Sequence, residues 1–196
     1  MSVNTEVPKI TVPQVRAFGD SVDLSSNRAS FPVSSSYASP IAINQIVKLN
    51  GSNVELAGAG DSVLGIVINV GLSTQVPRDN FLPASTGGYV EVLPFSKDGT
   101  GCDFELLLSE DGVGGATALA SGFADILQTI DNTTENVKFR RPQANVQLDS
   151  STAAGSAGSL SFSFRVEGSM INAISTAGTD CRQYLIRPVA AKIQTP

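Results

Sequence analysis

The residues of this chain that have chemically reactive side chains are serines, lysines, carboxylates and two cysteines, and histidine is absent. Without histidine neither a Ser–His nor a Cys–His pair can form, so the commonest general base is missing. A Ser–Lys pair stays formally open, but no lysine lies in a recognisable nucleophile motif. The lysines are Lys9, Lys48, Lys97, Lys138 and Lys192. These residue types argue against an enzyme.

Metal and phosphate sites have equally little support in the sequence. Residues 58–61, Gly-Ala-Gly-Asp, contain the glycines of a phosphate loop but lack the GxGxxG spacing, and a strand is expected next instead of a helix. The acids within 98–103 and 110–111 lack the alternate-residue pattern of a calcium loop. Cys102 and Cys181 permit one disulfide or two free thiols and are too few for a zinc site. We expect no cofactor and no metal.

Short β-strands are the elements expected to position these residues, and the clearest series covers residues 41–71. Ile41 and Ile43 alternate with Ala42 and Asn44, and Val47 and Leu49 alternate with Ile46 and Lys48. Val54 and Leu56 resume this alternation, whose period of two is that of a strand. Asn50-Gly51 supplies a hairpin turn that tolerates positive φ. Residues 58–61 supply a second turn, whose backbone the Asp61 side chain can cap.

The third strand of this series differs from the first two. Residues 63–68 are nearly all apolar and mostly β-branched, a pattern that suits a strand covered on both faces. Gly65 inside that run indicates a bulge or a close approach of another backbone.

The same series resembles a known family. A strand ending in VKLNGSNVELAGAGD and followed by VLGIVIN is similar to the core of tailed-phage head decoration proteins, also called capsid cement proteins. The resemblance implies a small β-barrel that is synthesised in the host cytoplasm and binds the exterior of an icosahedral capsid. It implies the major capsid protein as partner, a bridging role between capsid subunits, and a homo-oligomer, with a trimer favoured.

Composition is compatible with that role and excludes others. Charged residues are 16% of the chain, below the roughly 25% of a typical soluble domain. Such a surface suits packing against neighbouring copies, although turn-rich β proteins have similar compositions. Net charge is −5 without a long basic run, so we expect no nucleic-acid partner. No apolar run approaches the roughly 20 residues that span a bilayer, so we expect no membrane partner.

The predicted fold class is mainly β: a small β-barrel or sandwich with one short helix and an extended N-terminal arm. Residues 1–38 form the arm and residues 39–196 a single β-rich domain. The helix is expected over 116–130 because apolar residues recur there on one helical face. These residues are Leu119, Phe123, Ile126, Leu127 and Ile130. Further strands are expected near 89–93, 104–108, 144–148, 160–166 and 183–189.

Candidate contact residues lie in the arm and in one long loop. In the arm they are Ile10, Val12 and Phe18, with a frayed terminus or an edge strand as the alternative interpretation. In the loop 72–88 the candidate contact residue is Phe81. The alternative interpretation is that the Phe81 side chain returns to the core.

The alternative function is a carbohydrate- or receptor-binding β module of a virion fibre. Such modules usually display aromatic platforms, and this chain offers only Tyr37, Tyr89 and Tyr184, with no Trp.

Overall fold

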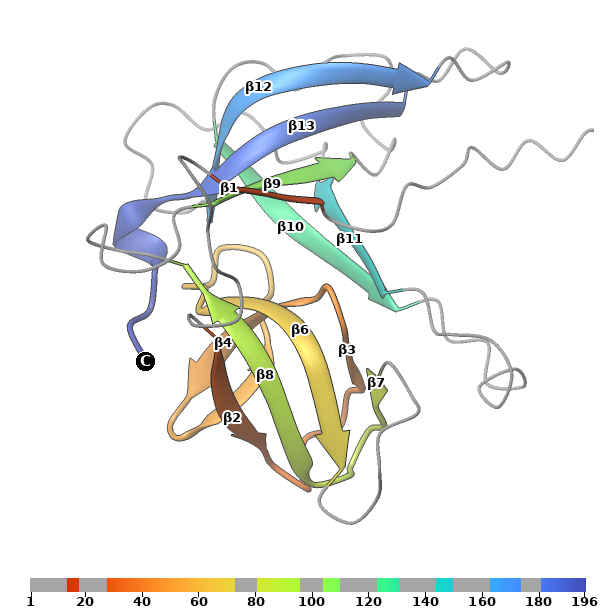
Figure 1. Cartoon of the computed structure of the whole chain (residues 1–196), viewed down its shortest axis with the longest axis vertical. Coiled ribbons are helices and arrows are strands. Elements are labelled where there is room, and N and C mark those ends of the chain that lie inside the picture. Colours follow the sequence, from red (N-terminus) through yellow and green to blue (C-terminus); the bar gives the residue numbers. More distant parts are fainter. Residues whose placement is uncertain are drawn as a thin grey trace, which may run out of the picture.

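The structure is a computed structural model, which describes residues 14–17, 28–72, 81–95, 104–109, 123–130, 144–149, 163–173 and 181–196. Within these residues the chain is mainly β, with two larger antiparallel sheets that lie one above the other (Figure 1). One short 3-10 helix, η1 (Ala190–Lys192), follows the last strand. No helix in the described segments is long and apolar enough to cross a membrane.

The five-stranded sheet contains most of the series predicted from residues 41–71. Its order is β2 (Ala29–Val33), β8 (Gly88–Pro94), β6 (Gly65–Leu72), β4 (Ile46–Asn50) and β5 (Asn53–Leu56). A two-stranded sheet, β3 (Ile41–Ala42) with β7 (Phe81–Leu82), lies beside it. Gly51 has φ +62° in the β4–β5 hairpin, so the predicted positive-φ turn is confirmed.

The six-stranded sheet is built mainly from the second half of the chain. Its order is β1 (Gln14–Ala17), β9 (Phe104–Ser109), β13 (Cys181–Pro188), β12 (Phe164–Ala173), β10 (Phe123–Ile130) and β11 (Ala144–Asp149). The strand expected near 160–166 continues to Ala173 as β12, and its register with β13 shifts between Val166 and Gly168. The expected end of this strand at residue 166 is wrong, because a bulge accommodates Gly168 without ending the strand.

Consecutive residues of the five-stranded sheet enter two different cores. Val67 belongs to an inner core on one face, and the preceding Ile66 to an inter-sheet core on the other. Val92 and Leu93 divide in the same way. The expected strand begins at Gly65, so the prediction of a strand covered on both faces is confirmed for residues 65–68; Val63 and Leu64 precede β6 and are buried in the two cores. The inner core consists of Val33, Ile41, Val47, Val54, Leu64, Val67, Val70, Leu82, Val90 and Val92.

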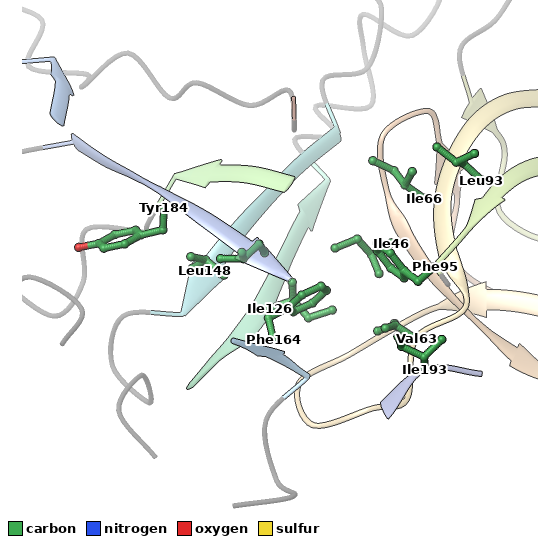
Figure 2. Close-up of a cluster of buried hydrophobic side chains, with 12 residues drawn as sticks. Ile46, Val63, Ile66, Leu93, Phe95, Ile126, Leu148, Phe164, Tyr184 and Ile193 are labelled. Carbon is green, nitrogen blue, oxygen red and sulfur yellow. The ribbon is translucent and has the colours of Figure 1, made fainter. Parts of the chain in front are cut away.

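The inter-sheet core joins the two sheets (Figure 2). Phe95 from the five-stranded side meets Phe164 from β12 edge to face, with ring centroids 6.1 Å apart. Each such buried ring contributes about 1.5–3 kcal/mol by area alone, and the edge-to-face geometry adds about 0.5–1.5 kcal/mol. The whole cluster is Ile46, Ala57, Val63, Ile66, Leu93, Phe95, Ile126, Leu148, Phe164, Tyr184, Ile186 and Ile193.

Gly65 lies at the start of β6, opposite Pro94 of β8. A Cβ at this position would overlap the carbonyl oxygen of Leu93. The predicted close backbone approach is therefore confirmed. The bulge of β6 lies further on, between Val67 and Asn69.

The sheets remain open in the described part of the chain, so the expected barrel closure is not found. β2 and β5 are the two edges of the five-stranded sheet and come near each other without a strand pairing. The Tyr37 hydroxyl, just after β2, accepts a hydrogen bond of 3.0 Å from the backbone N–H of Leu56 on β5. A side chain thus satisfies a donor of that edge.

The predicted helix over 116–130 is wrong where the structure describes it. Phe123–Ile130 is strand β10, which pairs with β11 and with β12. The apolar spacing misled because Ile126 and Ile130, four residues apart, share a face in a strand as well as in a helix. Pairing with β11 on one side and β12 on the other makes this segment a strand and not a helix. The local sequence pattern contains no information about such pairing. Residues 116–122 lie outside the described residues.

Part of the segment predicted as an N-terminal arm belongs to the sheets. Gln14–Ala17 pairs with β9, and Ala29–Val33 pairs with β8 at the edge of the five-stranded sheet. Pro32 is accommodated there because β2 is an edge strand, where a missing N–H is tolerated. The remaining arm residues up to 27 lie outside the described part.

Candidate functional site

Of the four candidate contact residues, the structure describes only Phe81. Ile10, Val12 and Phe18 lie outside the described residues. Phe81 lies in β7, where its backbone faces Ala42 of β3. The next residue, Leu82, is buried in the inner core, so the chain returns to the core within the segment predicted as a loop over 72–88.

Several polar contacts between described residues converge on the turn 58–61, within the series that resembles decoration proteins. Asp61 Oδ2 accepts a 2.8 Å hydrogen bond from the backbone N–H of Gly58, and Asp61 N–H donates to Gly58 O at 3.2 Å. Gly60 has φ +73°, a conformation that glycine adopts without strain. The prediction that Asp61 caps this turn is therefore confirmed.

Lys48 on β4 connects the turn to its own sheet. Its Nζ lies 2.9 Å from Asp61 Oδ2 and 3.3 Å from Glu55 Oε1 on β5. The hydrogen bond to Asp61 raises the pKa of Lys48; partial burial opposes this, and Glu55 adds to it. Lys48 is therefore held as an ammonium ion, which is unsuited to act as the base of a Ser–Lys pair.

The pKa of Asp61 shows the same pairing from the other side. Partial burial alone would raise this pKa. Hydrogen bonds from Lys48 and from Gly58 N–H, with the charges of Lys48 and Lys192, outweigh burial and lower it below the usual value. The carboxylate is consequently stabilised in its charged form.

Residues of the six-stranded sheet, and residues next to it, form hydrogen bonds with the same turn. Asp125 of β10 accepts from Gly60 N–H at 2.8 Å, and Ser163 Oγ donates to Asp61 O at 2.7 Å. Lys192 Nζ of η1 donates to Gly60 O at 2.6 Å. Asp125 and Ser163 are both buried. The turn is thus a polar connection between the two sheets, next to the apolar inter-sheet core.

The C-terminal residues extend this connection. Val63 and Ile193 form a parallel bridge, with Val63 N–H donating to Lys192 O at 2.7 Å and Gln194 N–H donating to Val63 O at 2.8 Å. Gln194 Oε1 accepts from Leu49 N–H at 2.7 Å, and Gln194 Nε2 donates to Leu49 O at 3.4 Å. The chain end therefore strengthens the five-stranded sheet.

Sequence reasoning did not identify Asp125, Ser163, Lys192 or Gln194 as partners of this turn. The available signal was an acid inside an apolar segment, Phe-Ala-Asp-Ile-Leu, which we assigned to a helix. The register also places Asp125 opposite Asp149 of β11. Among the described residues, no group of three or more Cys, Asp or Glu is placed to hold a metal ion.

The charged side chains around this turn all have hydrogen-bonding or ionic partners. The carboxylates are hydrogen-bonded, the lysines are paired or bonded to carbonyl oxygens, and the contacts join segments far apart in the sequence. This arrangement can fix the two sheets to each other. Comparisons with protein-family models, with curated proteins and with solved structures gave no match.

Proposed function

We propose that this protein decorates and stabilises an icosahedral phage capsid by bridging neighbouring capsid subunits on the exterior of the virion. The main support is the segment 46–72, which combines the resemblance to decoration proteins with the strand–turn–strand geometry that such a unit needs. The finer architecture we propose is sandwich-like, with two sheets packed across a shared core. The protein acts as a non-enzymatic scaffold whose partner is the major capsid protein.

A second support is that hydrogen bonds join the two sheets. The turn 58–61 is bonded to Asp125, Ser163 and Lys192 on the six-stranded side. A unit joined in this way that binds only the assembled lattice shifts the assembly equilibrium toward the intact shell by mass action. Homo-oligomers, with trimers favoured, increase that effect through multivalent attachment.

Co-sedimentation tests the proposal. Purified full-length protein is mixed with empty capsids of the phage that encodes it, and in parallel with unassembled capsid subunits. We expect the protein to pellet with capsids, to raise their melting temperature, and to ignore free subunits. Protein that stays in the supernatant at every capsid concentration refutes the proposal.

Removal of residues 1–13 tests the arm separately. The deletion includes Ile10 and Val12 and stops before β1, because Gln14–Ala17 pairs with β9. Loss of capsid binding with an unchanged melting temperature supports an arm contact. Normal binding rejects the arm contact and leaves the decoration role intact. Phe81→Ala is the corresponding test for the second candidate segment.

A further inference from the structure

One face of β8 has a covered half and an open half. Leu93 and Phe95 lie on this face and are buried in the inter-sheet core. Tyr89 and Glu91 lie on the same face, because side chains two residues apart along a strand point the same way. Tyr89 is 44% exposed, and it is the one large hydrophobic side chain that is exposed among the residues whose side chains the structure describes.

The strand register builds two rows of side chains across this open half. Pro32 and Gly71 lie opposite Tyr89 on the two neighbouring strands. In the next row, Ser30 and Asn69 lie opposite Glu91. The shift in β6 between Val67 and Asn69 brings Asn69 and Gly71 onto the outer face, since without it they would point toward the inner core.

The Tyr89 ring is fixed on the sheet. A Cβ added at Gly71 would overlap the Cζ and Cε2 atoms of that ring, so the distal half of the ring lies directly over the glycine backbone. One side of the ring is therefore covered by Gly71 and the rest is exposed. A ring that is already immobilised loses little side-chain entropy when a ligand stacks on it.

The adjacent row provides hydrogen-bonding groups without a net charge. Glu91 Oε2 accepts from Arg28 Nη1 and from Asn69 Nδ2, each at 3.3 Å. Arg28 and Glu91 form an ion pair with side chains 50% and 24% exposed. The row therefore presents planar donors and acceptors to solvent, with its positive and negative charges matched.

We propose that this surface, formed by Arg28, Pro32, Asn69, Tyr89 and Glu91, binds a neutral saccharide. A pyranose ring has an apolar face of C–H groups and an edge of hydroxyl groups. Stacked on Tyr89, it presents that edge to the Glu91 row, which lies about 7 Å away along the strand, at roughly 3.3–3.4 Å per residue. The hydroxyls then exchange hydrogen bonds with the Glu91 carboxylate and the Asn69 amide.

The same features disfavour other ligands. An extended peptide would add to the β2 edge, where Pro32 has no N–H to donate. An anionic ligand would need Arg28, whose charge Glu91 already balances. The proposal concerns ligand binding by this chain alone and does not depend on capsid attachment.

The first experiment uses the unmodified full-length protein. Because the chain has three tyrosines, selective labelling of tyrosine rings gives separate NMR signals for the exposed Tyr89, the hydrogen-bonded Tyr37 and the buried Tyr184. Neutral oligosaccharides of glucose, galactose, mannose, xylose and N-acetylglucosamine are titrated in turn. We expect the Tyr89 signals to shift while the other two stay. No Tyr89 shift with any of them overturns the proposal, as does a response to sulfated oligosaccharides alone.

Variants then test the stacking contact with the best of these oligosaccharides. Tyr89→Ala is expected to weaken binding about tenfold, a loss of the size that one aromatic contact contributes. Tyr89→Phe keeps the ring and is expected to bind as the wild type does. Tyr37→Phe is the matched control and is also expected to bind normally. Unchanged binding by a folded Tyr89→Ala protein overturns the proposal. If that variant does not fold, the ring titration of the unmodified protein decides.

Discussion

Replacing Asp61 by alanine tests whether the 58–61 turn holds the fold together as its contacts indicate. The substitution removes the acceptor for Gly58 N–H, at 2.8 Å, and the ion pair with Lys48, at 2.9 Å. A hydrogen bond to a charged group contributes about 1.5–3 kcal/mol, and we take the lower end because the Asp61 side chain is 34% exposed. The partly exposed ion pair adds about 0.5 kcal/mol.

The expected loss for Asp61→Ala is therefore about 2 kcal/mol. For a chain of this length, that corresponds to a fall in melting temperature of about 4–8 °C. Asp61→Asn keeps an oxygen acceptor for Gly58 but loses the charge, so its loss should be about half as large. Urea denaturation of both variants, followed by circular dichroism, gives the two free energies of unfolding.

A double-mutant cycle with Lys48→Met isolates the ion pair. The coupling between Lys48→Met and Asp61→Asn should be about 0.5 kcal/mol. The control is Arg28→Met, because Arg28 forms a more exposed ion pair with Glu91 and should cost less than about 0.5 kcal/mol. The reasoning is refuted if Asp61→Ala unfolds at the wild-type urea concentration, or if it is no less stable than Asp61→Asn.

Three further predictions concern close packing, the chain end and pH. Gly65→Ala should cost about 2–3 kcal/mol through overlap with the backbone of β8, whereas Gly58→Ala, whose Cβ would meet its nearest atom at 3.4 Å, should cost much less in the same melts. Ile193→Ala should cost about 2–4 kcal/mol because Ile193 lies in the inter-sheet core, and the exposed Thr195→Ala should be neutral by urea denaturation. Because the folded pKa of Asp61 is lowered, its stabilisation is present above the unfolded value of about 3.9 and is lost as pH falls through the lower folded value. The stability difference between wild type and Asp61→Asn should therefore shrink on acidification below about pH 4, and a constant difference would contradict the pairing.

Much of the five-stranded sheet could be predicted from the sequence because its signals are local. The apolar run from Val63 to Ile68 predicted a strand covered on both faces, and the structure divides it between two cores. The Asn50-Gly51 turn and the Asp61 cap also depend on residues close in sequence. These features could be predicted because residues close in sequence determine their geometry.

The rest could not be predicted because it depends on distant pairing. β10 was assigned to a helix, since an i, i+4 pair such as Ile126 and Ile130 fits both periods. Its strand state requires β11 and β12 on either side. Asp125 and Gln194 reach their partners across 65 and 145 residues of sequence. The local sequence around Asp125 or Gln194 does not indicate which distant backbone group each side chain will bind.

The covered and open halves of the β8 face limit how the two proposed roles can coexist. The six-stranded sheet already covers the end of this face that contains Leu93 and Phe95, so a flat partner that docks on the face must use the end that contains Tyr89. A capsid subunit docked there would displace a saccharide. If capsid attachment instead uses the N-terminal residues, the surface stays open on the particle. Adding the bound oligosaccharide to the co-sedimentation experiment separates these cases, because only the first predicts release of the protein from capsids.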